Sequence, residues 1–78
     1  MFQTARIDAD ARRRRAHLEH SQSAYARYAD EAKLMTAEAM KARDNGCLDT
    51  AIYFQREAEE CAVLARAWGA ALIDAMSE

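Results

Sequence analysis

Apolar residues are concentrated in the last third of the chain, where they recur at a helical period. Placed at 100° per residue, they form two adjoining stripes. The bulky stripe consists of Phe54, Cys61, Leu64, Trp68 and Leu72. The small-residue stripe consists of Ala51, Ala58, Ala62, Ala65 and Gly69, and ends in Met76. The pattern predicts one helix over residues 49–76 whose apolar arc spans about 160°, more than a single neighbouring helix covers.

A heptad-like seam runs through the first half of the chain, in alternating steps of three and four residues. Its positions are Ile7, Ala11, Arg14, Leu18, Ser21, Tyr25, Tyr28, Ala32, Met35, Ala39 and Ala42. The seam is regular from Tyr25 onward, whereas Arg14 and Ser21 interrupt it earlier. It predicts a first helix over residues 17–44. The segment "HSQS" at 20–23 leaves open whether the N-terminal third continues this helix, kinks it, or folds back as a third helix.

The strongest break between these patterns is "RDNGCLDT". Asn45 and Gly46 tolerate a positive φ and can end a helix in a left-handed cap, which predicts a turn over 45–48. We expect Asp49 to cap the second helix, with Leu48 and Tyr53 forming a hydrophobic staple across its first turn. These signals predict an all-α fold, a long antiparallel helical hairpin.

The composition favours close helix packing and a second copy of the chain. Alanine accounts for nineteen of the 78 residues, and there is no proline. A chain of this length buries only about 60% of the surface that it exposes when unfolded, so a monomer is marginal. We therefore expect a homodimer that forms a four-helix bundle. The expected dimer interface is Ala51, Ala58, Ala62, Ala65, Gly69, Leu72 and Met76.

The formal net charge of −2 conceals an asymmetry. Residues 1–29 hold six arginines against three acidic residues. Folding about Gly46 leaves residues 1–16 as a basic overhang that contains Arg12, Arg13, Arg14 and Arg15. Guanidinium groups bind carboxylates and phosphates. An acidic surface on a partner protein and a merely solvated arm are our two leading interpretations of the run, and nucleic acid is the third.

Aromatic residues are expected near the same open end of the hairpin. The predicted register brings Trp68 level with Ala24 and Tyr25, with Tyr28 one turn away. Core packing is our first interpretation of these aromatic residues. The alternative is a partner-binding hot spot, because tryptophan, tyrosine and arginine are the residue types that dominate such sites. The candidate partner-binding residues are Arg12, Arg13, Arg14, Arg15, His17, Tyr25, Tyr28 and Trp68.

The sequence carries no pattern that predicts catalysis, a cofactor or a small-molecule substrate. His17 and His20 lie three residues apart without a third metal ligand, so we expect no metal site. Cys47 and Cys61 are separated by about 21 Å along a helix, too far for a disulfide within one hairpin. The first residues lack the apolar core of a signal peptide and are too charged to span a bilayer, which predicts a cytoplasmic protein without membrane contact.

Residues 42–62 resemble the turn and second helix of a tetratricopeptide repeat. The resemblance is carried by Gly46, Leu48, Ala51-Ile52, Phe54 and Ala58. It implies a helical hairpin that binds protein, and it transfers no site residues. The chain departs from that family in having one hairpin, no repeat and a much longer first helix.

The function expected from these features is that of a non-enzymatic regulator or inhibitor that binds another protein. The small size and simple plan are typical of proteins that phages and mobile elements encode. A nucleic-acid-binding dimer that uses Arg12–Arg15 is the alternative, followed by a structural subunit of a larger assembly.

Overall fold

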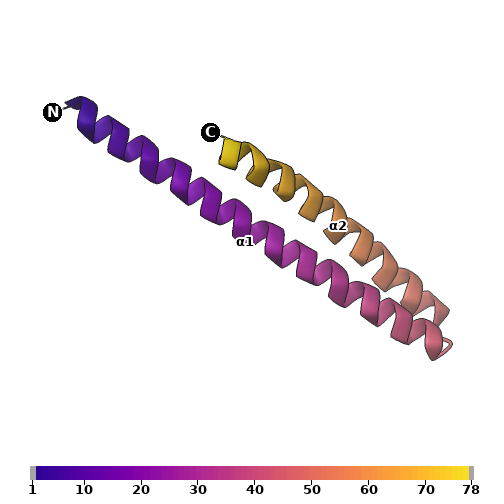
Figure 1. Ribbon diagram of the computed structural model, residues 1–78. Coiled ribbons are helices and arrows are strands. Elements are labelled where there is room, and N and C mark those ends of the chain that lie inside the picture. The colour runs from indigo at the N-terminus through magenta and orange to yellow at the C-terminus, as the bar shows by residue number, and fades with distance from the viewer. Residues whose placement is uncertain (1, 78) are drawn as a thin grey trace.

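The computed structural model describes the backbone of residues 2–77 and the side chains of residues 7–77. It consists of two antiparallel helices, α1 (Phe2–Asp44) and α2 (Leu48–Ser77), joined by a short turn (Figure 1). Together they form a rod of 67 × 14 × 13 Å. The expectation of an all-α helical hairpin is therefore confirmed.

Helix α1 runs without interruption through the "HSQS" segment, so between Phe2 and Asp44 there is neither a kink that ends the helix nor a folded-back third helix. The physical reason is the absence of a strong helix breaker, since this span contains no proline and no glycine. Serine in a helix interior costs only a few tenths of a kcal/mol relative to alanine. Ser21 and Ser23 therefore do not end the helix.

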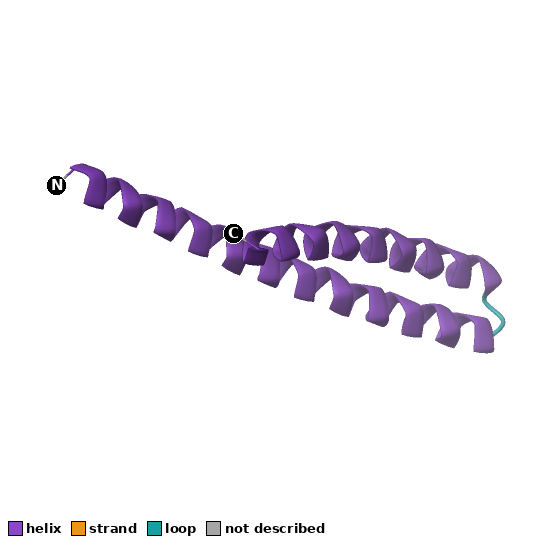
Figure 2. Cartoon of the chain, turned by 45° about the horizontal axis from the view of Figure 1, so that its top comes forward, coloured by secondary structure: helices purple, strands orange, loops and turns teal. Residues whose placement is uncertain are grey.

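The turn is a Schellman motif centred on Gly46, as the sequence predicts. Gly46 has a φ of 78°, its N–H donates to the carbonyl of Arg43 at 3.0 Å, and the N–H of Cys47 donates to the carbonyl of Ala42 at 2.8 Å. These two bonds satisfy carbonyls that the end of α1 leaves free. The chain reverses direction within three residues, 45–47 (Figure 2).

The start of α2 differs from the expected one. The N–H of Ala51 donates to the carbonyl of Cys47 at 2.9 Å, so Cys47 is the residue that precedes the helix and Asp49 lies inside its first turn. Asp49 does not cap the helix, although its negative charge interacts favourably with the positive end of the helix dipole. The two-residue shift also removes the staple, and Leu48 and Tyr53 are both more than half exposed.

The contact between the helices is built from small side chains. Its buried residues are Ser21, Ala39 and Ala42 of α1 and Ala51, Ala58, Cys61 and Ala65 of α2. Alanine at these positions allows the two backbones to approach closely. Helix α1 thus covers Ala51, Ala58 and Ala65 of the small-residue stripe together with Cys61, while the bulky Leu64 stays exposed.

Helix α1 has 43 residues and α2 has 30, so the N-terminal part of α1 extends past the end of α2 (Figures 1 and 2). No other segment of residues 2–77 lies beside it. The accessible surface of the chain is 6376 Å², whereas a compact monomer of this mass exposes about 4,800 Å². A single copy therefore leaves far more surface exposed than a globular domain does.

Candidate macromolecule-binding site

The arginine run lies on the overhang of α1, where α2 does not reach. Arg12, Arg13, Arg14 and Arg15 are all exposed. Arg13 Nη1 is 3.9 Å from Asp10 Oδ1, but both side chains are more than half exposed, so this ion pair stabilises the helix little. Successive residues of a helix point 100° apart, so the guanidinium groups surround the axis. The overhang is accordingly basic on several sides and open to ligands from any of them.

The overhang also carries unpaired apolar positions. Ile7 is 67% exposed, and Ala11, on the same seam, is exposed as well. These residues continue the line along which α2 packs further down α1, beyond the point where α2 ends. An isolated helical segment of this length is marginal in water. The overhang therefore offers a partner both charge and a strip of apolar surface.

A group of aromatic and basic side chains lies at the base of the overhang. The rings of His20 and Trp68 pack edge to face, with centroids 5.0 Å apart and planes at 85°. The guanidinium carbon of Arg27 lies 5.6 Å from the centroid of Tyr28, within the range of a cation–π contact. Together with neighbouring side chains they border a cavity of about 430 Å³, lined by His20, Ser23, Ala24, Arg27, Tyr28 and Trp68.

The aromatic cluster in the structure differs in part from the predicted one. Trp68 and Tyr28 line the same cavity, whereas the ring of Tyr25 lies against Gly69. The histidine that contacts Trp68 is His20, and the exposed His17 lies nearer the arginines. Residues four apart share one face of a helix. The sequence placed Ala24 level with Trp68, and His20 lies four residues before Ala24. This spacing could therefore have predicted that His20 lies opposite Trp68.

The residues expected at a dimer interface differ in how far they are buried within the single chain. Ala51, Ala58 and Ala65 are at most 8% exposed because α1 of the same chain covers them. The apolar arc of α2 thus turns its small side toward α1, although Ala58 and Ala62 also line a groove between the two helices. Ala62, Gly69 and Leu72 are half-buried, and Met76 is exposed.

The two thiols differ in environment and are both free. Cys47 is exposed in the turn, whereas Cys61 is buried with its Sγ 3.9 Å from Glu31 Oε2. Burial raises the pKa of Cys61, and the negative charges of Glu31, Glu57 and Glu60 raise it further. Cys61 is thus a poor nucleophile at neutral pH, because the thiolate is the reactive form.

The part of the chain that the structure describes contains no group of three metal-binding side chains. Neither α1 nor α2 combines the length and the apolar character needed to cross a bilayer. No family model, curated protein or solved structure matches the chain in the comparisons made. The resemblance of residues 42–62 to a tetratricopeptide hairpin therefore stays a prediction.

Proposed function

We propose that this chain is a non-enzymatic, homodimeric helical hairpin that regulates or inhibits another protein by binding an acidic surface with its open end. The observation that carries the proposal is the position of Arg12–Arg15 on a helical overhang that α2 does not reach (Figure 1). Four exposed guanidinium groups on a helical extension form a surface suited to carboxylates.

The side chains around the arginines favour a protein over a nucleic acid as the partner. Ile7 and Ala11 add an apolar strip, and the half-buried Trp68 and Tyr28 lie at its base. Aromatic anchors with arginines nearby are typical of the residues that contribute most to protein–protein affinity. A phosphate backbone would bind the positive charges and would make no use of the apolar strip or the aromatic rings.

Two features support the homodimer and the cellular setting that we propose. The excess of exposed surface over that of a globular monomer is about as large as the whole area that a standard interface buries. Both cysteines are unpaired, which suits the reducing cytoplasm. The small size and simple plan of the chain also favour a phage or mobile-element origin.

The alternative is a nucleic-acid-binding dimer, which the exposure of all four arginines also supports. The two functions differ in their response to salt. Phosphate binding releases counterions, so each lost phosphate contact lowers the log–log salt slope by about 0.7 to 0.9. Rim charges in a protein–protein interface mainly change the association rate.

The test compares two charge-matched double variants in a capture experiment from nuclease-treated lysate of the source cells. Arg12→Ala/Arg13→Ala and Arg56→Ala/Arg66→Ala each remove two exposed positive charges. The proposal predicts that the wild type and the second variant capture the same protein and that the first variant loses it. Equal capture by both variants, or capture that occurs only in a parallel lysate without nuclease treatment, would contradict it.

A further inference from the structure

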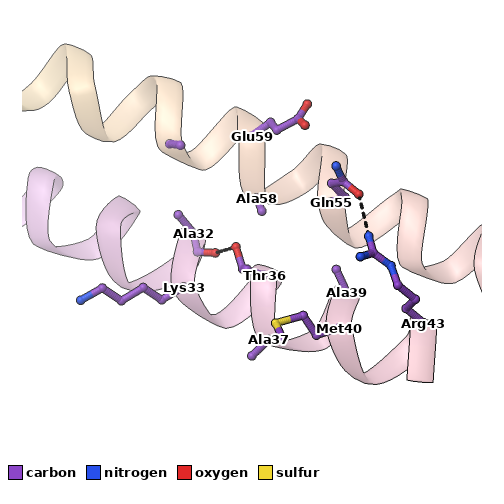
Figure 3. Close-up of a pocket in the computed structure, with 11 residues that line it drawn as sticks. Ala32, Lys33, Thr36, Ala37, Ala39, Met40, Arg43, Gln55, Ala58 and Glu59 are labelled. Atoms are coloured by element: carbon purple, nitrogen blue, oxygen red, sulfur yellow. Dashed lines mark hydrogen bonds between the residues drawn. The ribbon is translucent and has the colours of Figure 1, made fainter. Parts of the chain in front are cut away.

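A groove runs along one side of the hairpin between α1 and α2. Its volume is about 740 Å³, and it is lined by Ala32, Lys33, Thr36, Ala37, Ala39, Met40, Arg43, Gln55, Ala58, Glu59 and Ala62. Figure 3 shows Ala32, Ala39 and Ala58 pointing into the space between the helices. The floor therefore consists of small apolar side chains, over which another helix can approach closely.

The two rims of the groove differ in charge. Lys33 and Arg43 lie on the α1 rim, and Glu59 lies on the α2 rim. Arg43 Nη2 donates to Gln55 Oε1 at 3.4 Å and closes the groove at the turn end (Figure 3). Both ion pairs found among the described residues are local to α1 and involve neither Lys33 nor Glu59.

The hairpin register sets the heights of these charges. Cys61 lies opposite Glu31, with Sγ and Oε2 3.9 Å apart. Lys33 lies two residues after Glu31 on α1, and Glu59 lies two residues before Cys61 on α2. Because the helices are antiparallel, Lys33 and Glu59 lie at the same height, on opposite rims. By the same register, Met40 of α1 lies level with Ile52 of α2, and both are at least half exposed.

We propose that this groove is the homodimer interface and that a second copy of the chain docks on it about a two-fold axis parallel to the helices. Such an axis places α1 of each copy over α2 of the other. Equivalent residues of the two copies then lie at the same height along the helix direction. Lys33 of one copy then faces Glu59 of the other, and Met40 faces Ile52. This assignment rests on the homodimer proposed above. Of the small-residue stripe it keeps Ala58 and Ala62, which line the groove, and leaves out Ala51 and Ala65, which α1 covers.

The rim charges favour this arrangement over the other face-to-face one. A two-fold axis across the helices would place α1 over α1, which brings the basic rims of both copies together. Like charges in an interface oppose association, and opposite charges fix the register. The parallel axis places both turns at one end of the bundle. It also places both arginine overhangs together at the other end, where they form one basic surface with two copies of Arg12–Arg15.

Surface variants with a matched control test the face. Ala37 is exposed in the single chain and lines the groove, whereas Ala67 is exposed and does not line it. We expect Ala37→Glu to raise the dimer dissociation constant at least tenfold in sedimentation equilibrium, and Ala67→Glu to leave it unchanged. Because both residues are exposed, neither substitution disturbs the packing between α1 and α2.

Charge reversal tests the rim pairing. Lys33→Glu and Glu59→Lys should each weaken the dimer, and the double variant should restore the wild-type dissociation constant, since it rebuilds the pair with opposite signs. Additive weakening in the double variant would overturn the pairing of Lys33 with Glu59.

The exposed Cys47 in the turn allows a direct measurement of orientation. A spin label on Cys47, in a Cys61→Ala chain, should report an inter-label distance of about 20 Å when the turns lie at one end. The paired part of the hairpin is about 40 Å long, so opposite orientation would give a distance near or above that length. A long distance would overturn the parallel axis.

The outcomes separate this inference from the proposed function. A wild-type chain that is monomeric at high micromolar concentration would refute the homodimer and with it the docking on the groove. A stable dimer that Ala67→Glu disrupts and Ala37→Glu does not would overturn only the choice of face. Neither result bears on capture of a partner through Arg12 and Arg13.

Discussion

The ring of Tyr25 packs on Gly69, so closely that a Cβ at position 69 would lie 3.3 Å from both Cδ2 and Cε2. This contact joins α1 to α2 near the open end of the hairpin. Glycine inside a helix costs about 0.8 to 1.0 kcal/mol relative to alanine. Helix propensity therefore favours alanine at position 69, whereas the space that the ring of Tyr25 occupies favours glycine.

We expect Gly69→Ala to stabilise the protein by about 0.5 kcal/mol. Tyr25 is 43% exposed, so its ring can move outward by the few tenths of an ångström that the new methyl group requires. Urea denaturation followed by circular dichroism, at one protein concentration, measures the change. A lower midpoint would show that the ring is held in place.

At Gly46 the expected effect arises from the backbone alone. Its φ is +78°, and a Cβ built there meets no atom within 4 Å. Gly46→Ala should therefore destabilise the hairpin by about 1 kcal/mol, the cost of a left-handed conformation for a residue with a side chain. Gly46→Asn should cost less, because asparagine tolerates this region better. Equal losses for the two variants would argue against this origin.

Ser21 is fully buried, and among the described side chains its Oγ is a buried polar atom without a hydrogen-bond partner. Leaving a buried hydroxyl unpaired costs about 1 to 3 kcal/mol. Ser21→Ala should therefore raise stability by about 1 kcal/mol. Ser23→Ala is the matched control, because Ser23 is exposed and reports only the difference in helix propensity. No difference between the two would imply that the Ser21 hydroxyl is satisfied in solution.

The raised pKa of Cys61 predicts a specific loss of stability in alkali. Because the folded thiol holds its proton more tightly than the unfolded one, its contribution is complete below the ordinary value of 9.0 and is lost as the pH rises above it. Stability should therefore fall more steeply above about pH 9 in the wild type than in Cys61→Ala. Iodoacetamide at neutral pH should modify Cys47 first. Parallel pH profiles for the two proteins would contradict the effect.

Much of the fold follows from local signals in the sequence. Asn45-Gly46 predicted the turn because few other residues adopt a positive φ, and the absence of proline and glycine from residues 2–44 explains why α1 is continuous. The helix-capping residue was predicted two positions too late. The Schellman motif ends at Cys47, whose carbonyl already accepts the first bond of α2, and Asp49 comes after it.

The side of α2 that faces α1 could not be derived from its pattern. Two adjoining apolar stripes permit two packings, and periodicity does not distinguish them. The structure packs the side with Ala51, Ala58 and Ala65 against α1, because small residues bring the backbones closest. The pairing of His20 with Trp68 was missed for a related reason, since its rings depend on side-chain direction as well as on helix register.

The mass of the wild-type chain in solution tests the account most directly. We expect a two-helix hairpin of 8.8 kDa with a small alanine core and an open groove to be marginally stable alone, and we propose that it dimerises. Light scattering at micromolar concentration should give twice 8.8 kDa, with unfolding that shifts to higher temperature as concentration rises. A cooperatively folded monomer of 8.8 kDa, with a melting temperature independent of concentration, would contradict it.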